Sequence, residues 1–160
     1  MVDVMIDHRM PDVPHPPKIL PIQRLRPDAH MPQRAHPWDA GLDLVAVEAV
    51  TLDAGQRGVV PTGIAIAIPT GWAGLVVPRS GLARRQGITL TNSPGLIDAG
   101  YRGEVQILVI NHDTSSHTIS RGERIAQLVI IPVLIAPTLE VTELPASDGR
   151  AAGGFGSSGR

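Results

Sequence analysis

The sequence predicts an all-β protein: an antiparallel jelly roll or distorted β-barrel with one short helix. From Gly41 onward, short apolar runs are separated by Gly, Pro, Asn and Asp, which is the spacing of strands and turns. Large and small apolar side chains alternate in residues 63–68, as the interior of a tapering barrel or sandwich prefers. We therefore expect strands in the apolar runs at 42–47, 57–68, 73–77, 88–91, 104–110, 116–119, 124–131 and 138–142.

Two further elements complete the predicted fold. Residues 18–22 are expected to form an edge strand, since the prolines around them cannot lie in an inner strand. Residues 80–86 are predicted to form the helix, with Ser80 as its N-cap and Gly87 as the residue that ends it. The interior must be packed mainly from aliphatic side chains, because the chain has one Phe, one Tyr and two Trp.

Composition narrows the possible functions. The 160 residues are 42% hydrophobic and carry a formal net charge of −1, which suits one globular domain. The absence of cysteine excludes disulfides, thiolate zinc sites and cysteine nucleophiles. A near-neutral chain with few aromatics does not favour a nucleic-acid groove. The sequence contains no apolar run long enough to span a membrane, so we expect a cytoplasmic protein that binds neither nucleic acid nor membrane.

The chain divides into three parts by composition. Residues 1–38 hold eight of the fifteen prolines and four of the six histidines, but their irregular spacing favours a solvated tail over a metal site. The glycines after residue 148 cannot support a fold of their own. We therefore predict a flexible extension at 1–16, a β domain at 17–145 and a glycine-rich segment at 146–160.

Two segments within the β domain carry candidate chemistry. Arg79, Ser80 and Gly81 bring a guanidinium, a hydroxyl and free amides to the start of the helix, which suits phosphate. An ordinary turn with a surface arginine is the alternative. Asp98 and Tyr101 lie in a segment with three glycines, at 95–104, which we interpret as a hairpin. Such a hairpin can present an acid and a ring to a ligand, although turn chemistry alone explains everything except the tyrosine.

Three other features add to these candidates. Phe155 stands among glycines and serines near the C-terminus, where a closing lid would need a stacking ring and a linker would gain nothing from one. Asp43 and Gln127 each interrupt an apolar run. When buried, such groups need partners, and they are more often structural residues than ligands.

Together and in this order, the five segments resemble the five motifs of the trimeric deoxyuridine triphosphate pyrophosphatase (dUTPase) family, over about residues 18–160. The resemblance implies a homotrimer with exchanged C-terminal arms. It also implies that dUTP is hydrolysed to dUMP and pyrophosphate with Mg²⁺, which limits uracil incorporation into DNA and supplies dUMP for dTMP synthesis.

The resemblance also implies roles for individual residues. Asp98 matches the carboxylate that deprotonates the water attacking the α-phosphorus, and Tyr101 matches the ring that excludes a 2′-hydroxyl. Asp43 matches the acid that reaches Mg²⁺ through water. The remaining positions match groups around the base (Asn92, Leu96, Ile97), groups around the phosphates (Arg79, Ser80, Gly81, Gln127) and a lid whose Phe155 stacks on uracil (Arg150, Phe155, Gly156, Ser157, Ser158).

The chain departs from the family pattern in its lid. Arg150 is followed by two alanines, where the family usually has a glycine directly after the arginine, and Ser158 replaces a common threonine. A dCTP deaminase shares the fold and a similar Arg-Ser motif, but needs a catalytic glutamate where this chain has Leu108. A non-catalytic trimeric binding module is the second alternative, and the presence of Asp98, Tyr101 and Gln127 speaks against it.

Overall fold

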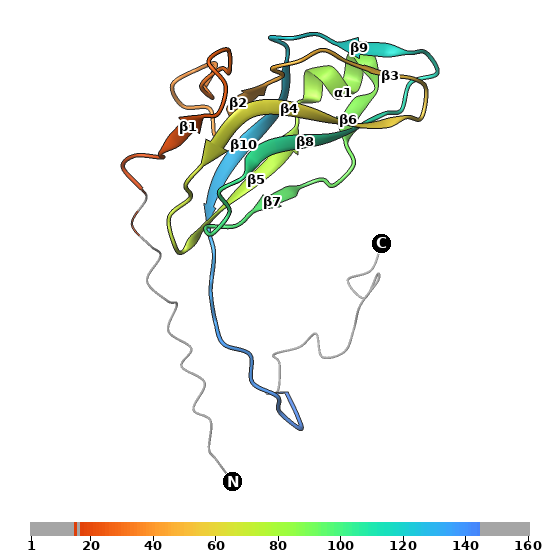
Figure 1. Ribbon diagram of the computed structural model, residues 1–160. Helices are drawn as coiled ribbons and strands as arrows, with labels where there is room; N and C mark the ends of the chain where they lie inside the picture. Colours follow the sequence, from red (N-terminus) through yellow and green to blue (C-terminus); the bar gives the residue numbers. More distant parts are fainter. Residues whose placement is uncertain (1–14, 16, 145–160) are drawn as a thin grey trace.

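The computed structural model describes residue 15 and residues 17–144, and the predicted lid therefore lies outside the described residues. The described part contains strands and one short helix, α1 (Ser80–Gln86) (Figure 1). The strands are β1 (Ile22–Arg24), β2 (Leu42–Val45), β3 (Val50–Leu52), β4 (Arg57–Ile66), β5 (Trp72–Pro78), β6 (Ile88–Leu90), β7 (Gly95–Ile97), β8 (Glu104–Asn111), β9 (His117–Ile119) and β10 (Arg124–Pro132).

The strands form three antiparallel sheets. Two have four strands, in the orders β1-β4-β8-β6 and β2-β10-β5-β7, and β3 pairs with β9 in a small third sheet. The predicted antiparallel β fold with one short helix is confirmed. No helix among the described residues is long and apolar enough to cross a membrane.

The core is aliphatic and contains side chains from both four-stranded sheets. Along β8, Val105, Ile107 and Val109 are buried, whereas the residues between them are less buried or exposed. Leu44 of β2 and Leu128 of β10 are fully buried in the same cluster. Each such side chain contributes about 1.5–3 kcal/mol by leaving water. The alternation along β8 therefore fixes which of its residues face the solvent.

Several element boundaries differ from the prediction. Residues 138–142 are not a strand but belong to an exposed extended segment (Figure 1). Strand β1 begins at Ile22, so most of the expected strand at 18–22 is irregular. The short strands β3 and β7 were not predicted. Each has only three residues, too few for a clear alternation of polar and apolar side chains.

The helix has its predicted range but a different N-cap. Arg79 occupies that position with extended backbone angles and no side-chain capping bond, and Ser80 is the first helical residue. The C-terminus is as predicted, since Gly87 is left-handed with φ of 62° and its amide donates to the carbonyl of Ala83. The hydroxyl of Ser80 is therefore not used as a cap.

Candidate active site

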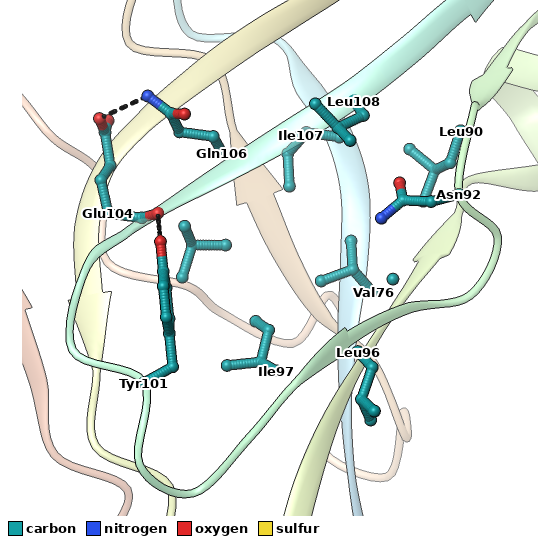
Figure 2. A pocket seen from close by; sticks show the side chains of 12 residues that line it. Val76, Leu90, Asn92, Leu96, Ile97, Tyr101, Glu104, Gln106, Ile107 and Leu108 are labelled. Carbon is teal, nitrogen blue, oxygen red and sulfur yellow. Dashed lines mark hydrogen bonds between the residues drawn. The ribbon is translucent and has the colours of Figure 1, made fainter.

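A cavity of about 260 Å³ opens between β7 and β8 and collects four predicted base-side and sugar-side residues: Asn92, Leu96, Ile97 and Tyr101 (Figure 2). Its other walls come from β5, from the end of β6 and from β8 itself. The side chains of Asn92 and Tyr101 lie at opposite ends of the cavity in Figure 2, and apolar side chains line the space between them. The cavity thus combines apolar side chains with polar groups at its ends, as small-molecule sites commonly do.

The strand pairing explains why the cavity exists. Strand β7 pairs with β5, and β8 pairs with β4 and β6, so β7 and β8 belong to different sheets. The segment at 95–104 is therefore not a paired hairpin, as the sequence suggested, but a crossing between sheets. Strand β6 reaches only Val109, and the amide of Thr91 then donates to the carbonyl of Leu108. From Leu108 back towards Glu104, the same edge of β8 faces β7 across the cavity and can offer backbone groups to a flat ligand.

Tyr101 is held in place at one end of this cavity. Its hydroxyl donates a 2.8 Å hydrogen bond to the carbonyl of Glu104, and the side chain is 45% exposed. Gly103 lies against the ring, because a Cβ on this glycine would be 2.6 Å from the hydroxyl oxygen. The ring therefore has a fixed orientation, which depends on a residue without a side chain at position 103.

Asp98 lies directly after β7 and is exposed. Its carbonyl accepts a hydrogen bond from the amide of Tyr101, which closes the turn between the two residues. Within residues 17–144, no hydrogen bond or ion pair of its carboxylate is found. The carboxylate is therefore free to bind a ligand or a water molecule.

A second group of residues forms around Asp43, which is 7% exposed on β2. Its Oδ1 accepts a 3.1 Å hydrogen bond from Nε of Arg79, and its Oδ2 accepts one of 3.0 Å from Nη1 of Arg124. Arg79 also donates through Nη1 to the backbone carbonyl of Arg124 at 3.1 Å. These bonds connect β2, β10 and the start of α1, so we call Asp43, Arg79, Arg124 and Gln127 the charged cluster.

Gln127 belongs to this cluster by strand register. It lies opposite Asp43 on one side and opposite Val77 of β5 on the other, so the side chains of Gln127 and Asp43 share a face of the sheet. The side chain lies close to Gly41, where a Cβ would be 3.0 Å from its Oε1. Gln127 is thus half-buried beside Asp43, as the interrupted apolar run had suggested.

Arg124 is a member of the cluster that the sequence did not reveal. Residues 124 and 127 of a regular strand would face opposite sides. A β-bulge between Arg124 and Ala126 changes this, because Arg124 then pairs with Val45 while Gln127 pairs with Asp43. Both side chains consequently face the side of Asp43, and nothing in the apolar pattern indicated the bulge.

Ser80 and Gly81 lie next to this cluster, at the start of α1. Ser80 is exposed, and the first turn of the helix contains no acidic residue. The first amides of a helix have no acceptor within it. A hydroxyl, amides without an acceptor in the helix and the adjacent Arg79 thus lie together where the sequence predicted phosphate binding.

The described residues do not hold a group of three or more His, Asp or Glu side chains that could enclose a metal ion. A carboxylate oxygen has two acceptor positions, so each oxygen of Asp43 retains one after its bond to arginine. Asp43 can thus accept a hydrogen bond from a metal-bound water. The residues present fit an Mg²⁺ ion whose direct ligands are phosphate oxygens and water.

The comparisons with known proteins agree on one family. A sequence model of the dUTPase family matches residues 27–159. A deoxyuridine 5′-triphosphate nucleotidohydrolase from Leifsonia xyli subsp. xyli is 55% identical over 130 residues, which cover 81% of this chain and 85% of the relative. One from Mycolicibacterium gilvum is 50% identical over 145 residues, covering 88% of this chain and 94% of the relative.

Solved structures of the same family are also similar. The dUTPase of Staphylococcus bacteriophage 80alpha with dUpNHpp gives a TM-score of 0.84 at 32% identity, covering 90% of this chain and all of that one (100%). A mutant dUTPase from phage phi11 of S. aureus, described with a structural Mg(II) ion, gives 0.76 at 28% identity, covering 80% and 99% of the two chains.

Proposed function

Because the chain belongs to the dUTPase family, we propose that it is a dUTP diphosphatase, which hydrolyses dUTP to dUMP and pyrophosphate. One observation carries the proposal: strand β5 connects the charged cluster to a cavity that is lined by apolar side chains and edged by backbone groups. The cavity suits a base and a sugar, and the cluster suits phosphates. Hydrolysis of this kind limits uracil incorporation into DNA and supplies dUMP for dTMP synthesis, and we expect it to take place in the cytoplasm.

The base is selected by backbone hydrogen bonds at the edges of the cavity. Uracil presents O4 as an acceptor and N3–H as a donor, and cytosine presents the reverse polarity at both positions. Backbone groups of Leu96 and Ile97 and the amide of Asn92 are the candidate partners. A site built for one polarity rejects the other strongly, because its buried polar groups would be left unpaired.

The sugar is selected by Tyr101. Its ring is fixed by the hydrogen bond to Glu104 and by contact with Gly103, so it cannot easily move aside. A deoxyribose packs against the flat face, and a 2′-hydroxyl meets the ring. We therefore assign discrimination between dUTP and UTP to this side chain.

The phosphates bind Arg79, Ser80, Gly81 and Gln127. Mg²⁺, when bound, offsets the negative charge of the triphosphate and thereby opens phosphorus to attack. Asp43 fixes the direction of Arg79 through the Nε bond and accepts a hydrogen bond from water around the metal. Gln127 adds an amide that can donate to a phosphate oxygen.

Asp98 acts as the general base. Its free carboxylate accepts the proton of a water molecule while the water oxygen forms a bond to the α-phosphorus and pyrophosphate leaves. A well-placed base contributes about 10²–10⁴-fold to such a step. Its position next to Tyr101 directs the water towards the phosphate nearest the sugar.

We propose that the complete site requires a homotrimer with exchanged C-terminal arms. After Val133, whose amide donates to the carbonyl of Gly71, the chain leaves the domain body (Figure 1). This segment exposes large apolar side chains at Leu134, Ile135, Leu139, Val141 and Leu144. On the outer face of the β1-β4-β8-β6 sheet, Val59 and Leu108 are directly paired and remain 48% and 40% exposed. Burial of these surfaces between subunits would remove them from water.

The lid belongs to the same proposal. Arg150, Phe155, Gly156, Ser157 and Ser158 lie outside the described residues, and their assignment rests on the family motif. We propose that Phe155 stacks on uracil and that the other four close over the outer phosphates. The division into a flexible extension at 1–16, the β domain and a lid segment at 146–160 is part of this proposal.

Incubation of the protein with dUTP, dCTP, dTTP and UTP in the presence of Mg²⁺ tests the proposal. We expect dUMP and pyrophosphate from dUTP, with far slower turnover of the other three nucleotides. Release of ammonia from dCTP would instead identify a deaminase, although the exposed Leu108 offers no carboxylate for that reaction. A measurement of mass in solution, with a trimer expected, tests the assembly separately.

A further inference from the structure

We infer that Arg85 is an additional phosphate-binding residue, which supplies an unneutralised positive charge beside Ser80 and Gly81. The inference rests on the proposed function and extends its phosphate site. Arg85 was not among the residues that the sequence motifs singled out. Three observations support the assignment: its place in the structure, a guanidinium without a partner among residues 17–144, and the contrast with Arg84.

The first support is geometric. Arg85 follows Gly81 by four residues in α1, so the two positions are neighbours on one face of the helix. A Cβ on Gly81 would lie 3.1 Å from Nη1, 3.2 Å from Nη2 and 3.4 Å from Cζ of Arg85. The guanidinium therefore folds back over the first turn of the helix, into space that the glycine leaves open.

The second support is electrostatic. Arg79 is the cation that the family motif assigns to phosphate, but its Nε bonds Asp43 and one terminal nitrogen bonds a backbone carbonyl. Much of its charge is thus offset before a ligand arrives. Arg85 is exposed, and within the described part of the chain its guanidinium takes part in no ion pair or hydrogen bond. Its donors remain available for a bidentate contact to a phosphate.

The third support is the contrast with Arg84. Both arginines lie in the last turn of α1, where positive charge interacts favourably with the helix C-terminus. That general effect would apply equally to both side chains. The three heavy atoms nearest to a Cβ on Gly81 all belong to Arg85, so a specific role in binding phosphate should separate the two residues.

Substitution of each arginine tests the inference. Arg85→Met keeps the aliphatic stem and removes the charge, Arg85→Lys keeps a charge without the planar fork, and Arg84→Met is the matched control. We expect Arg85→Met to weaken binding of the non-hydrolysable dUTP analogue dUpNHpp by about 10–100-fold, the worth of one charge-assisted contact. Arg85→Lys should fall between the wild type and Arg85→Met, and Arg84→Met should match the wild type.

Deoxyuridine serves as the ligand control because it carries no phosphate. Its affinity should be the same in the wild type and in Arg85→Met. An equal loss for deoxyuridine and dUpNHpp, or an Arg85→Met variant that binds dUpNHpp as tightly as Arg84→Met, would overturn the inference. Thermal unfolding of all variants identifies any loss of fold, and Arg85→Lys carries the test alone if the methionine variant does not fold.

Failure of this inference can be distinguished from failure of the proposed function. Wild-type protein that does not convert dUTP refutes the proposed activity, whatever Arg85 does. Wild-type protein that converts dUTP, together with an Arg85→Met variant of unchanged KM and unchanged dUpNHpp affinity, refutes only the role of Arg85.

Discussion

Asp43 and Asp98 are two carboxylates of the proposed site with opposite surroundings. Asp43 is nearly buried on the edge strand β2, and each of its carboxylate oxygens is bonded to a different arginine. Asp98 is exposed in a crossing between sheets, and its carboxylate has no bonded partner in the described structure. The described residues of one chain therefore complete the surroundings of Asp43 and leave those of Asp98 open.

This difference indicates that Asp43 holds other side chains in position, whereas Asp98 takes part in the chemical step. A carboxylate with two arginine partners holds both guanidinium groups in place, and accepting a proton would break those hydrogen bonds. A carboxylate without partners can accept a proton at little cost to the fold. We therefore expect substitutions of the two residues to have different effects on turnover, on binding and on stability.

The largest effect is expected for Asp98→Asn. The amide cannot accept the proton of the attacking water, so kcat should fall by at least about 100-fold. Binding of dUpNHpp and the thermal unfolding temperature should stay close to those of the wild type. Steady-state kinetics and calorimetry measure these quantities, and Asp53→Asn, a change to another exposed turn aspartate, is the control. Retained turnover in Asp98→Asn would exclude Asp98 as the base.

Asp43→Ala should have a smaller effect on turnover but a clear effect on stability. The change leaves Arg79 and Arg124 without their shared partner, which should cost about 1–3 kcal/mol in the free energy of unfolding. Nucleotide binding should also weaken, because Arg79 loses its fixed direction. Urea denaturation and dUpNHpp titration test both parts. Unchanged stability would mean that the charged cluster does not hold the strands together.

Tyr101→Phe should have a modest effect that is confined to sugar selection. The ring remains, but it loses the hydrogen bond to the carbonyl of Glu104, which is worth about 0.5–1.5 kcal/mol. We expect discrimination between dUTP and UTP, measured as the ratio of kcat/KM values, to fall by up to about tenfold. Tyr101→Ala should reduce it further. Equal ratios in all three proteins would assign sugar selection to another residue.

The smallest effect is expected at Asp28, a surface carboxylate bonded to Arg26 and Arg121. The Arg26 guanidinium lowers the pKa of Asp28 below its ordinary value of 3.8. Its stabilising contribution is therefore complete above pH 3.8 and is lost as the pH falls towards the lowered value. Because the carboxylate is only partly buried and its two arginine partners are more exposed, Asp28→Asn should scarcely change stability at neutral pH or turnover. A loss as large as that of Asp43→Ala would contradict the distinction between buried and surface ion pairs.

The sequence predicted those parts of the fold whose signals are local. The longer strands, with their alternating or continuous apolar residues, and the helix ending at Gly87 were all expected. The run at 138–142 also alternates, but a strand needs a neighbour, and the described part of a single chain offers it none. Local patterns thus predicted where strands can form and could not determine which partner they need.

The candidate site likewise contains residues that local sequence patterns revealed and others that depend on contacts between distant segments. Asp43 and Gln127 were recognisable because each interrupts an apolar run, and the register places them opposite one another. Arg124 was missed because the bulge that turns it towards Asp43 depends on pairing with β2. The crossing at 95–104 was read as a hairpin because its glycines are typical of turns, whereas β7 and β8 pair with other strands. Both errors concern contacts between distant segments, which the local sequence pattern does not reveal.

The most direct test of the central proposal is hydrolysis of dUTP in isotopically labelled water, followed by mass analysis of both products. Attack on the α-phosphorus, with Asp98 taking the proton of the water, places one labelled oxygen in dUMP and none in pyrophosphate. Label in pyrophosphate would mean that water attacks the β-phosphorus, and this would contradict the proposed alignment of Asp98, Tyr101 and the phosphate site.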